Sequence, residues 1–242
     1  MSSYKRVDGR NYDELRPIKA EVRVLKNADG SALFELGNTK VIAAVYGPRE
    51  LHSKHIAASY ESLVRVRYHM VPFSVKERKS QPFTRREIEI SKVIKEALSA
   101  CIRRELFPRS TIDIYVEVLN ADGSTRVASL NATSLALADA GVFMYDLIAA
   151  VSVGKIQGQL IVDLNEYEDQ NSEADIPIAF MPSLNKVVLL QMDGVMTYEE
   201  MKEALKLARN AAEKNISNRK RMFEKFSRIS FESLRLFVIW KE

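Results

Sequence analysis

The sequence predicts a mixed α/β fold, in which several strands precede a helix in each half of the chain. Short apolar runs separated by Asp-Gly, Gly-Asn and Gly-Pro turns indicate the strands. Two T-x-x-E capping boxes, Thr84–Glu87 and Thr197–Glu200, each open a segment with apolar residues at helical spacing. With 242 residues, the chain is long enough for one sizeable domain or two tightly packed halves.

Composition limits the class of protein. An apolar share of 46% and a charged share of 28% are typical of a folded globular chain and not of a disordered one. The net charge of +4 favours an anionic partner. The single cysteine, Cys101, cannot form an internal disulfide, so we expect a cytoplasmic protein with Cys101 in its core. No apolar run is long enough to span a membrane, and the N-terminus does not resemble a signal peptide.

The first half begins with a charged lead-in at residues 4–17 and continues with strands. Alternating or continuous apolar patterns predict them at 18–25, 32–36, 41–46 and 64–70. We expect Gly47-Pro48 to end the third strand and a polar loop to follow over 49–60. The fourth strand should carry one basic face. Together these strands predict an antiparallel meander.

The first helix should begin after Thr84 and continue until Pro108, because its apolar positions keep a 3.6-residue period. Arg85 and Arg86 lie in its first turn, at the positive end of the helix dipole. Each is unfavourable there by about 0.3–1 kcal/mol. Either both are solvated or pair with Glu89, or an external anion such as an RNA phosphate binds beside them.

The stretch Asn120–Arg126 lies between a predicted strand at 112–119 and a small-residue helix at 127–140, which should end at Gly141. A strand, a Gly-Ser-Thr turn and a helix together direct backbone N–H groups toward an anion. Arg126 adds a planar fork suited to phosphate. The spacing is not that of a Walker loop, and an ordinary tight turn fits equally well.

The second half contains an acidic segment, 163–175, with six carboxylates in an otherwise basic chain. Predicted strands flank it, at 147–153, 159–164, 176–181 and 186–192. Apolar strands on both sides favour a site over a solvated linker, whereas the spacing argues against calcium, zinc or a Ser/His/Asp triad. A second helix follows Thr197. The tail from Asn218 could extend this helix or reach a neighbouring chain.

Nine short motifs occur in the order found in a known family. They are Arg6-x-Asp8-Gly9-Arg10, Asp29-Gly-Ser31, Gly37-Asn38-Thr39, Gly47-Pro48-Arg49-Glu50, Arg85-Arg-Glu87, Asp122-Gly-Ser-Thr-Arg126, Ala138-Asp-Ala-Gly141, Asp163-Leu-Asn165 and Glu173-Ala-Asp175. Through them the chain resembles the RNase PH family, and especially the catalytic RNase PH-type subunit of the archaeal exosome. The resemblance covers about residues 5–215, which predicts an RNase PH-like domain at 1–215 and a C-terminal extension of uncertain structure at 216–242.

The resemblance implies an α/β (α+β) RNase PH-like fold, with mixed sheets and packed helices in two β-α-β-α-like halves. It also implies a hexameric ring that threads single-stranded RNA through its centre. In the exosome form, a related but inactive RNase PH-like subunit would alternate with this one in a heterohexameric ring, under RNA-binding cap subunits. No membrane partner is implied.

The resemblance also implies roles for individual residues. Ser124, Thr125 and Arg126 would bind inorganic phosphate, although the family usually has glycine where Ser124 stands. Asp169 would be the general acid, and Asp175, with Asp169 beside it, would hold Mg²⁺ or Mn²⁺.

The resemblance implies RNA-binding roles for residues in two further segments. Arg85 and Arg86 would grip the 3′-end phosphates, and the loop with Lys54 and His55 would face the central channel. The expected activity is 3′→5′ phosphorolysis of RNA to nucleoside diphosphates, reversible as RNA tailing. The alternatives are a stand-alone RNase PH that trims tRNA 3′ ends, and a non-catalytic RNA-binding ring subunit.

Overall fold

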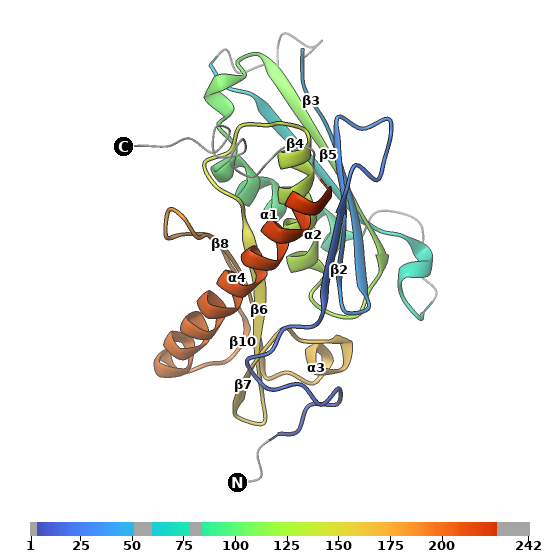
Figure 1. Ribbon diagram of the computed structural model, residues 1–242. Coiled ribbons are helices and arrows are strands. Elements are labelled where there is room, and N and C mark those ends of the chain that lie inside the picture. The colour runs from blue at the N-terminus through green and yellow to red at the C-terminus, as the bar shows by residue number, and fades with distance from the viewer. Residues whose placement is uncertain (1–3, 51–59, 78–83, 227–242) are drawn as a thin grey trace.

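The computed structural model describes residues 4–50, 60–77 and 84–226 of the 242-residue chain. Over these residues the chain forms two five-stranded sheets with helices between and across them (Figure 1). This is the mixed α+β fold that the sequence predicts. Lys54 and His55 lie outside the described residues.

The N-terminal sheet has the strand order β1-β2-β3-β5-β4. Its strands are β1 (Ile18–Val22), β2 (Gly30–Leu36), β3 (Thr39–Glu50), β4 (Leu63–Met70) and β5 (Ser110–Asn120). The predicted antiparallel meander is right for β1 to β3 but wrong for β4, which pairs in parallel with β5. The reason is the crossover through α1 (Arg85–Cys101), because parallel neighbours cannot be joined by a tight turn.

Two predicted boundaries in this half are wrong. Strand β3 does not end at Gly47-Pro48 but continues to Glu50, with a register shift between Tyr46 and Arg49. A bulge of this kind accommodates proline, which has no N–H for the ladder. Helix α1 ends at Cys101 and not near Pro108, because Ile102 is extended and bridges Met144. The turn η2 (Arg104–Leu106) follows.

The predicted start of α1 is confirmed. The Thr84 hydroxyl accepts from the Glu87 N–H, and the Glu87 carboxylate accepts from the Thr84 N–H at 2.8 Å. Cys101 is buried at the other end of the helix, as expected, and burial raises the pKa of its thiol to about 12.

Helix α2 (Thr125–Asp139) is almost wholly buried between the two sheets, against β2, β3 and β6. Small side chains let the strands approach its backbone closely. A Cβ at Gly30 of β2, for example, would lie 2.3 Å from the Ala136 carbonyl oxygen. The helix ends as predicted, with Gly141 at a φ of +70° just beyond it.

The C-terminal sheet is antiparallel, in the order β10-β8-β6-β7, with β9 also paired to β8. Its strands are β6 (Ala149–Ile156), β7 (Gln159–Val162), β8 (Ala174–Met181), β9 (Lys186–Leu190) and β10 (Asp193–Gly194). The short helix α3 (Glu166–Gln170) lies in the acidic segment and was not predicted.

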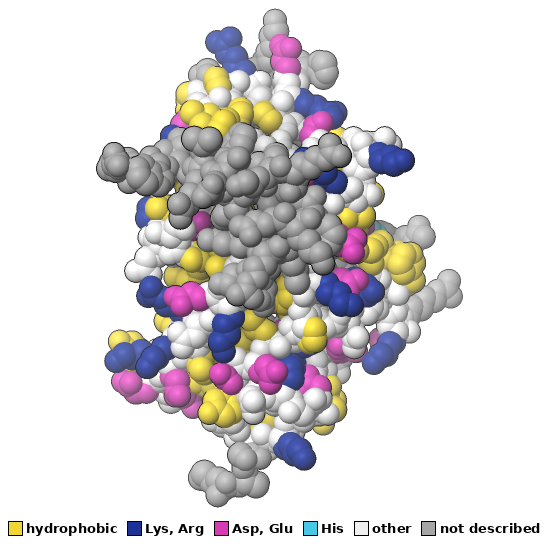
Figure 2. All heavy atoms as spheres, in the orientation of Figure 1, with side chains coloured by type: hydrophobic (Ala, Val, Ile, Leu, Met, Phe, Trp, Pro, Cys, Tyr) yellow, Lys and Arg dark blue, Asp and Glu magenta, His cyan; other side chains and the backbone are white. Residues whose placement is uncertain are grey.

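Helix α4 (Tyr198–Phe226) packs against both β6 and β1 and so connects the two halves (Figure 1). The predicted Thr197–Glu200 capping box opens it. Of the two interpretations of the tail, helix extension is confirmed as far as Phe226. Acidic and basic side chains are mixed over the N-terminal part of α4 in Figure 2. None of the helices described is long and apolar enough to cross a membrane.

Candidate active site

A cleft of about 810 Å³ collects most of the residues that the sequence singled out. Helix α1 contributes Arg85 and Arg86, and α2 contributes Arg126. The C-terminal half contributes Asp169 from α3 and Asp175 from β8. Side chains from both halves of the chain therefore meet in one basic and acidic cleft.

The turn before α2 has the geometry of an anion site. Gly123 and Ser124 adopt left-handed conformations, with φ of +70° and +53°, and the helix begins at once with Thr125. No side chain among the described residues caps its N-terminus, in contrast to α1 and α3, which both have capping boxes. The first N–H groups of α2 thus keep their hydrogen-bonding capacity for an anion.

Ser124 does not direct its side chain into the cleft. Its hydroxyl lies 2.7 Å from the Ser152 hydroxyl and donates to the Leu164 carbonyl at 2.9 Å. The Thr125 hydroxyl accepts from the buried Tyr68 hydroxyl at 3.2 Å. Neither Ser124 nor Thr125 lines the cleft, so of the predicted phosphate-binding side chains only that of Arg126 does.

The guanidinium of Arg126 is held from across the cleft. Its Nη1 donates to the amide oxygen of Gln191 at 2.6 Å. Its Nε is buried and has no hydrogen-bond partner among the described residues. Gln191 was missed by the sequence analysis, because a neutral side chain between two short strands carries no motif.

Two of the carboxyls that line the cleft, Asp169 and Asp175, have raised pKa values. Burial is the main cause for Asp169, and the charge of Asp193 adds to it, while Arg86 and Arg126 act in the opposite direction. Burial also raises the pKa of Asp175, to about 7, with a further contribution from Asp169. A raised pKa increases the neutral fraction of a carboxyl at a given pH, and the neutral form can donate a proton. Repulsion from neighbouring acids thus raises these two pKa values less than burial does.

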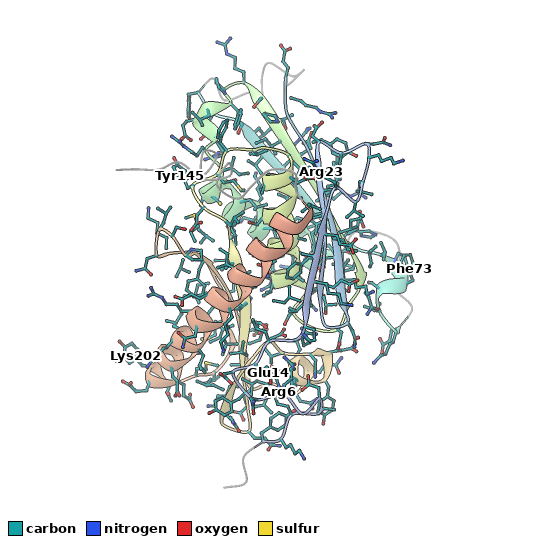
Figure 3. The ribbon with its side chains drawn as sticks, viewed as in Figure 1. Arg6, Glu14, Arg23, Phe73, Tyr145 and Lys202 are labelled. Atoms are coloured by element: carbon teal, nitrogen blue, oxygen red, sulfur yellow. The ribbon has the colours of Figure 1, made fainter. Side chains whose placement is uncertain are left out.

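Two other acids of the segment, Asp163 and Glu168, are buried and have structural roles. Arg16 donates to both oxygens of buried Asp163, at 3.0 Å from Nε and 2.7 Å from Nη2. Arg6 forms a two-pronged pair with buried Glu168, at 2.8 and 2.7 Å. Figure 3 shows Arg6 and Glu14 together beside α3, where the lead-in segment crosses it.

Arg16 also connects the anion turn to the acidic segment. It donates to the backbone carbonyls of Asp122, in the turn, and Leu164, just before α3. The Gly123 backbone also packs closely against Leu164, since a Cβ on Gly123 would lie 2.6 Å from the Leu164 carbonyl oxygen. The arginine pairs therefore fix α3, and with it Asp169, against the start of α2.

A divalent metal fits the donor chemistry only in part. Asp175 has a buried Oδ1 with no hydrogen-bond partner in the described part of the chain, and Asp169 and Asp193 line the same cleft with oxygen donors. Within the described ranges, no group of three His, Cys, Asp or Glu side chains is arranged to hold a metal ion. A bound Mg²⁺ would thus complete its shell with water and substrate oxygens, as is common for this ion.

Two family models match the chain: the 3′ exoribonuclease family (RNase PH) domain 1 over residues 14–142, and domain 2 of the same family over residues 146–211. The chain belongs to the RNase PH family of 3′ exoribonucleases, which confirms the resemblance found in the sequence.

Comparison with individual proteins shows which members of this family the chain is similar to. It is 55% identical over 229 residues to exosome complex component Rrp41 of Pyrococcus horikoshii, covering 94% of this chain and 92% of the relative. It is 54% identical over 209 residues to Rrp41 of Pyrobaculum islandicum, covering 86% and 85%. The crystal structure of rice Rrp46 has a TM-score of 0.79 at 27% identity, covering 86% of this chain and 95% of that one.

Proposed function

We propose that this chain is the catalytic subunit of an exosome ring of the archaeal type and degrades single-stranded RNA from its 3′ end with inorganic phosphate. The observation that carries the proposal is Arg126 at the uncapped start of α2, in one cleft with Asp169 and Asp175, two carboxyls of raised pKa. The names of the relatives, which are exosome components, support it.

The reaction follows from this arrangement. Phosphate binds at the start of α2 and Arg126, and attacks the last phosphodiester bond of the RNA. Arg85 and Arg86 hold the 3′-terminal phosphates, and Asp169 in its neutral form protonates the departing 3′ oxygen. The products are a nucleoside diphosphate and an RNA one nucleotide shorter. Because a phosphoanhydride forms as the ester breaks, the same site extends RNA from nucleoside diphosphates when phosphate is scarce.

Metal and partners complete the proposal. Asp175, with Asp169, would hold Mg²⁺ or Mn²⁺, which supplies positive charge against the phosphates in the transition state. The ring would alternate this chain with a related inactive subunit, under RNA-binding cap subunits, in the cytoplasm. The loop with Lys54 and His55 is expected to face the channel.

The two alternatives receive less support. A stand-alone RNase PH is not favoured, because the most similar relatives given above are exosome components. A non-catalytic ring subunit is not favoured either, because Arg126, Asp169 and Asp175 are all present and share the cleft.

A product assay on the assembly that this chain forms with its native partners tests the proposal. Single-stranded RNA and Mg²⁺ are supplied with and without inorganic phosphate, and the released nucleotides are identified. Nucleoside diphosphates that appear only with phosphate support phosphorolysis. Nucleoside monophosphates would mean hydrolysis, and bound RNA without any product would mean a scaffold subunit.

A further inference from the structure

The side chain of Arg126 is oriented by a neutral group. Its Nη1 donates to the Gln191 amide oxygen at 2.6 Å, and none of the ion pairs among the described residues involves Arg126. Acidic groups are nevertheless close, since the charge of Arg126 lowers the pKa of both Asp169 and Asp175. Among the described residues no ion pair therefore neutralises the guanidinium, although Asp169 and Asp175 line the same cleft.

Strand β8, which carries Asp175, also holds Gln191 in place. Its backbone N–H bonds to the Pro177 carbonyl of β8 at 3.3 Å, and β10, which begins two residues later, pairs Asp193 with Asp175. The Arg126–Gln191 bond therefore joins the start of α2, in the first half, to the Asp175 strand in the second.

The chemistry of the amide explains why glutamine suits this position. An amide oxygen accepts a hydrogen bond and fixes the direction of the guanidinium without neutralising it. A glutamate would form a two-pronged ion pair with Arg126 and would repel phosphate. An apolar residue would leave a second guanidinium nitrogen without a partner, beside the Nε that already lacks one.

We propose that Gln191 is a positioning residue, which aims Arg126 at the attacking phosphate and preserves its positive charge. The inference rests on the proposed phosphorolytic function and deepens it. Gln191 acts through Arg126, so its effect should appear in phosphate binding and not in RNA binding.

The test compares two substitutions in the assembled complex, with initial rates measured over a range of phosphate concentrations. Gln191→Met should raise the KM for phosphate about tenfold, equivalent to about 1.4 kcal/mol, with a smaller change in kcat. Gln191→Glu should raise it further. The Kd for single-stranded RNA should change less than about twofold in both, because the charge of Arg126 acts on phosphate.

Gln170 supplies the matched control, because it lines the same cleft at the end of α3 and has the same side chain. Gln170→Met and Gln170→Glu should change the KM for phosphate clearly less than the Gln191 pair. Equal effects of the two pairs would overturn the inference, as would a KM within about twofold of wild type in both Gln191 variants.

A second background separates positioning from direct substrate contact. In Arg126→Lys, which keeps the charge but removes the fork, adding Gln191→Met should change the KM for phosphate at most about twofold. A full tenfold effect in this background would overturn the positioning role. Wild-type complex that releases nucleoside diphosphates only with phosphate shows that the proposed function stands, whatever the Gln191 variants do.

Discussion

The substitution Asp163→Asn tests the structural half of the acidic segment. The Asp163 and Arg16 side chains are 2% and 5% exposed, and Asp163 also accepts from the Arg16 N–H at 2.8 Å. Asparagine has nearly the same shape as aspartate, but one carboxylate oxygen becomes an amide nitrogen. That hydrogen-bond donor would face the Arg16 guanidinium, which is also a donor. Removing one partner of such a buried pair typically costs about 3–5 kcal/mol, because it leaves an uncompensated charge.

Thermal unfolding followed by circular dichroism measures this cost. For a domain of this size, each kcal/mol lowers Tm by about 2–4 °C, so Asp163→Asn should lower it by about 6–20 °C. The comparison is made at one protein concentration, because assembly also shifts Tm.

Glu166→Gln is the matched control from the same segment. Glu166 pairs with Lys76, whose side chain is 89% exposed, and solvent-exposed pairs contribute only about 0–1 kcal/mol. The control should therefore lower Tm by no more than about 4 °C. Equal, small shifts in both variants would refute the division of these acids into buried and exposed groups.

Four further outcomes can be measured. Asp169→Asn should abolish RNA turnover and leave RNA binding intact in a filter-binding assay. Without divalent cations, Asp175→Asn should unfold at higher urea concentration than wild type at pH 8, and the gap should close toward pH 4. At pH values between the ordinary pKa of Asp175 and about 7, the native state binds a proton at Asp175 that the unfolded state has lost. The free energy of unfolding of the wild type therefore falls as pH rises through that window, by up to roughly 4 kcal/mol. Arg85→Ala and Arg86→Ala should each reduce the slope of log RNA affinity against log salt by about 0.7, if each neutralises one phosphate. Ser124→Gly should leave the KM for phosphate unchanged, and its urea midpoint should move little, because relief of the left-handed strain, about 1–2 kcal/mol, offsets most of the loss of two hydrogen bonds of about 1 kcal/mol each.

Local signals made the helix starts and the turn between β5 and α2 predictable. The capping boxes at Thr84 and Thr197 close within four residues, so the sequence contains both partners of each bond. The start of α3 has the same kind of signal, in which Asn165 accepts from the Glu168 N–H, yet it was missed. Its five residues are too few for a helical period, and the carboxylates around it suggested ligands.

Non-local contacts explain what the sequence could not provide. Asp163 and Glu168 look like the other acids until Arg16 and Arg6, about 150 positions earlier in the chain, are seen to face them. The placement of β5 between β3 and β4 depends on pairing across α1, which no short pattern encodes. Gln191 reaches Arg126 only because the two halves pack together.

Because the site depends on contacts between distant parts of the chain, directional hydrogen bonds and ion pairs hold it together in addition to apolar packing. Arg16 satisfies the backbone carbonyls of Asp122 and Leu164 while it pairs with Asp163. An apolar side chain of equal volume would leave both carbonyls without this partner, at a cost that burial of the extra apolar surface would have to offset. It would also leave the spacing between the turn and α3 free to vary. In the proposed mechanism Asp169 and the phosphate must lie at a fixed separation, and the buried arginine would serve that chemistry by fixing two backbones at once.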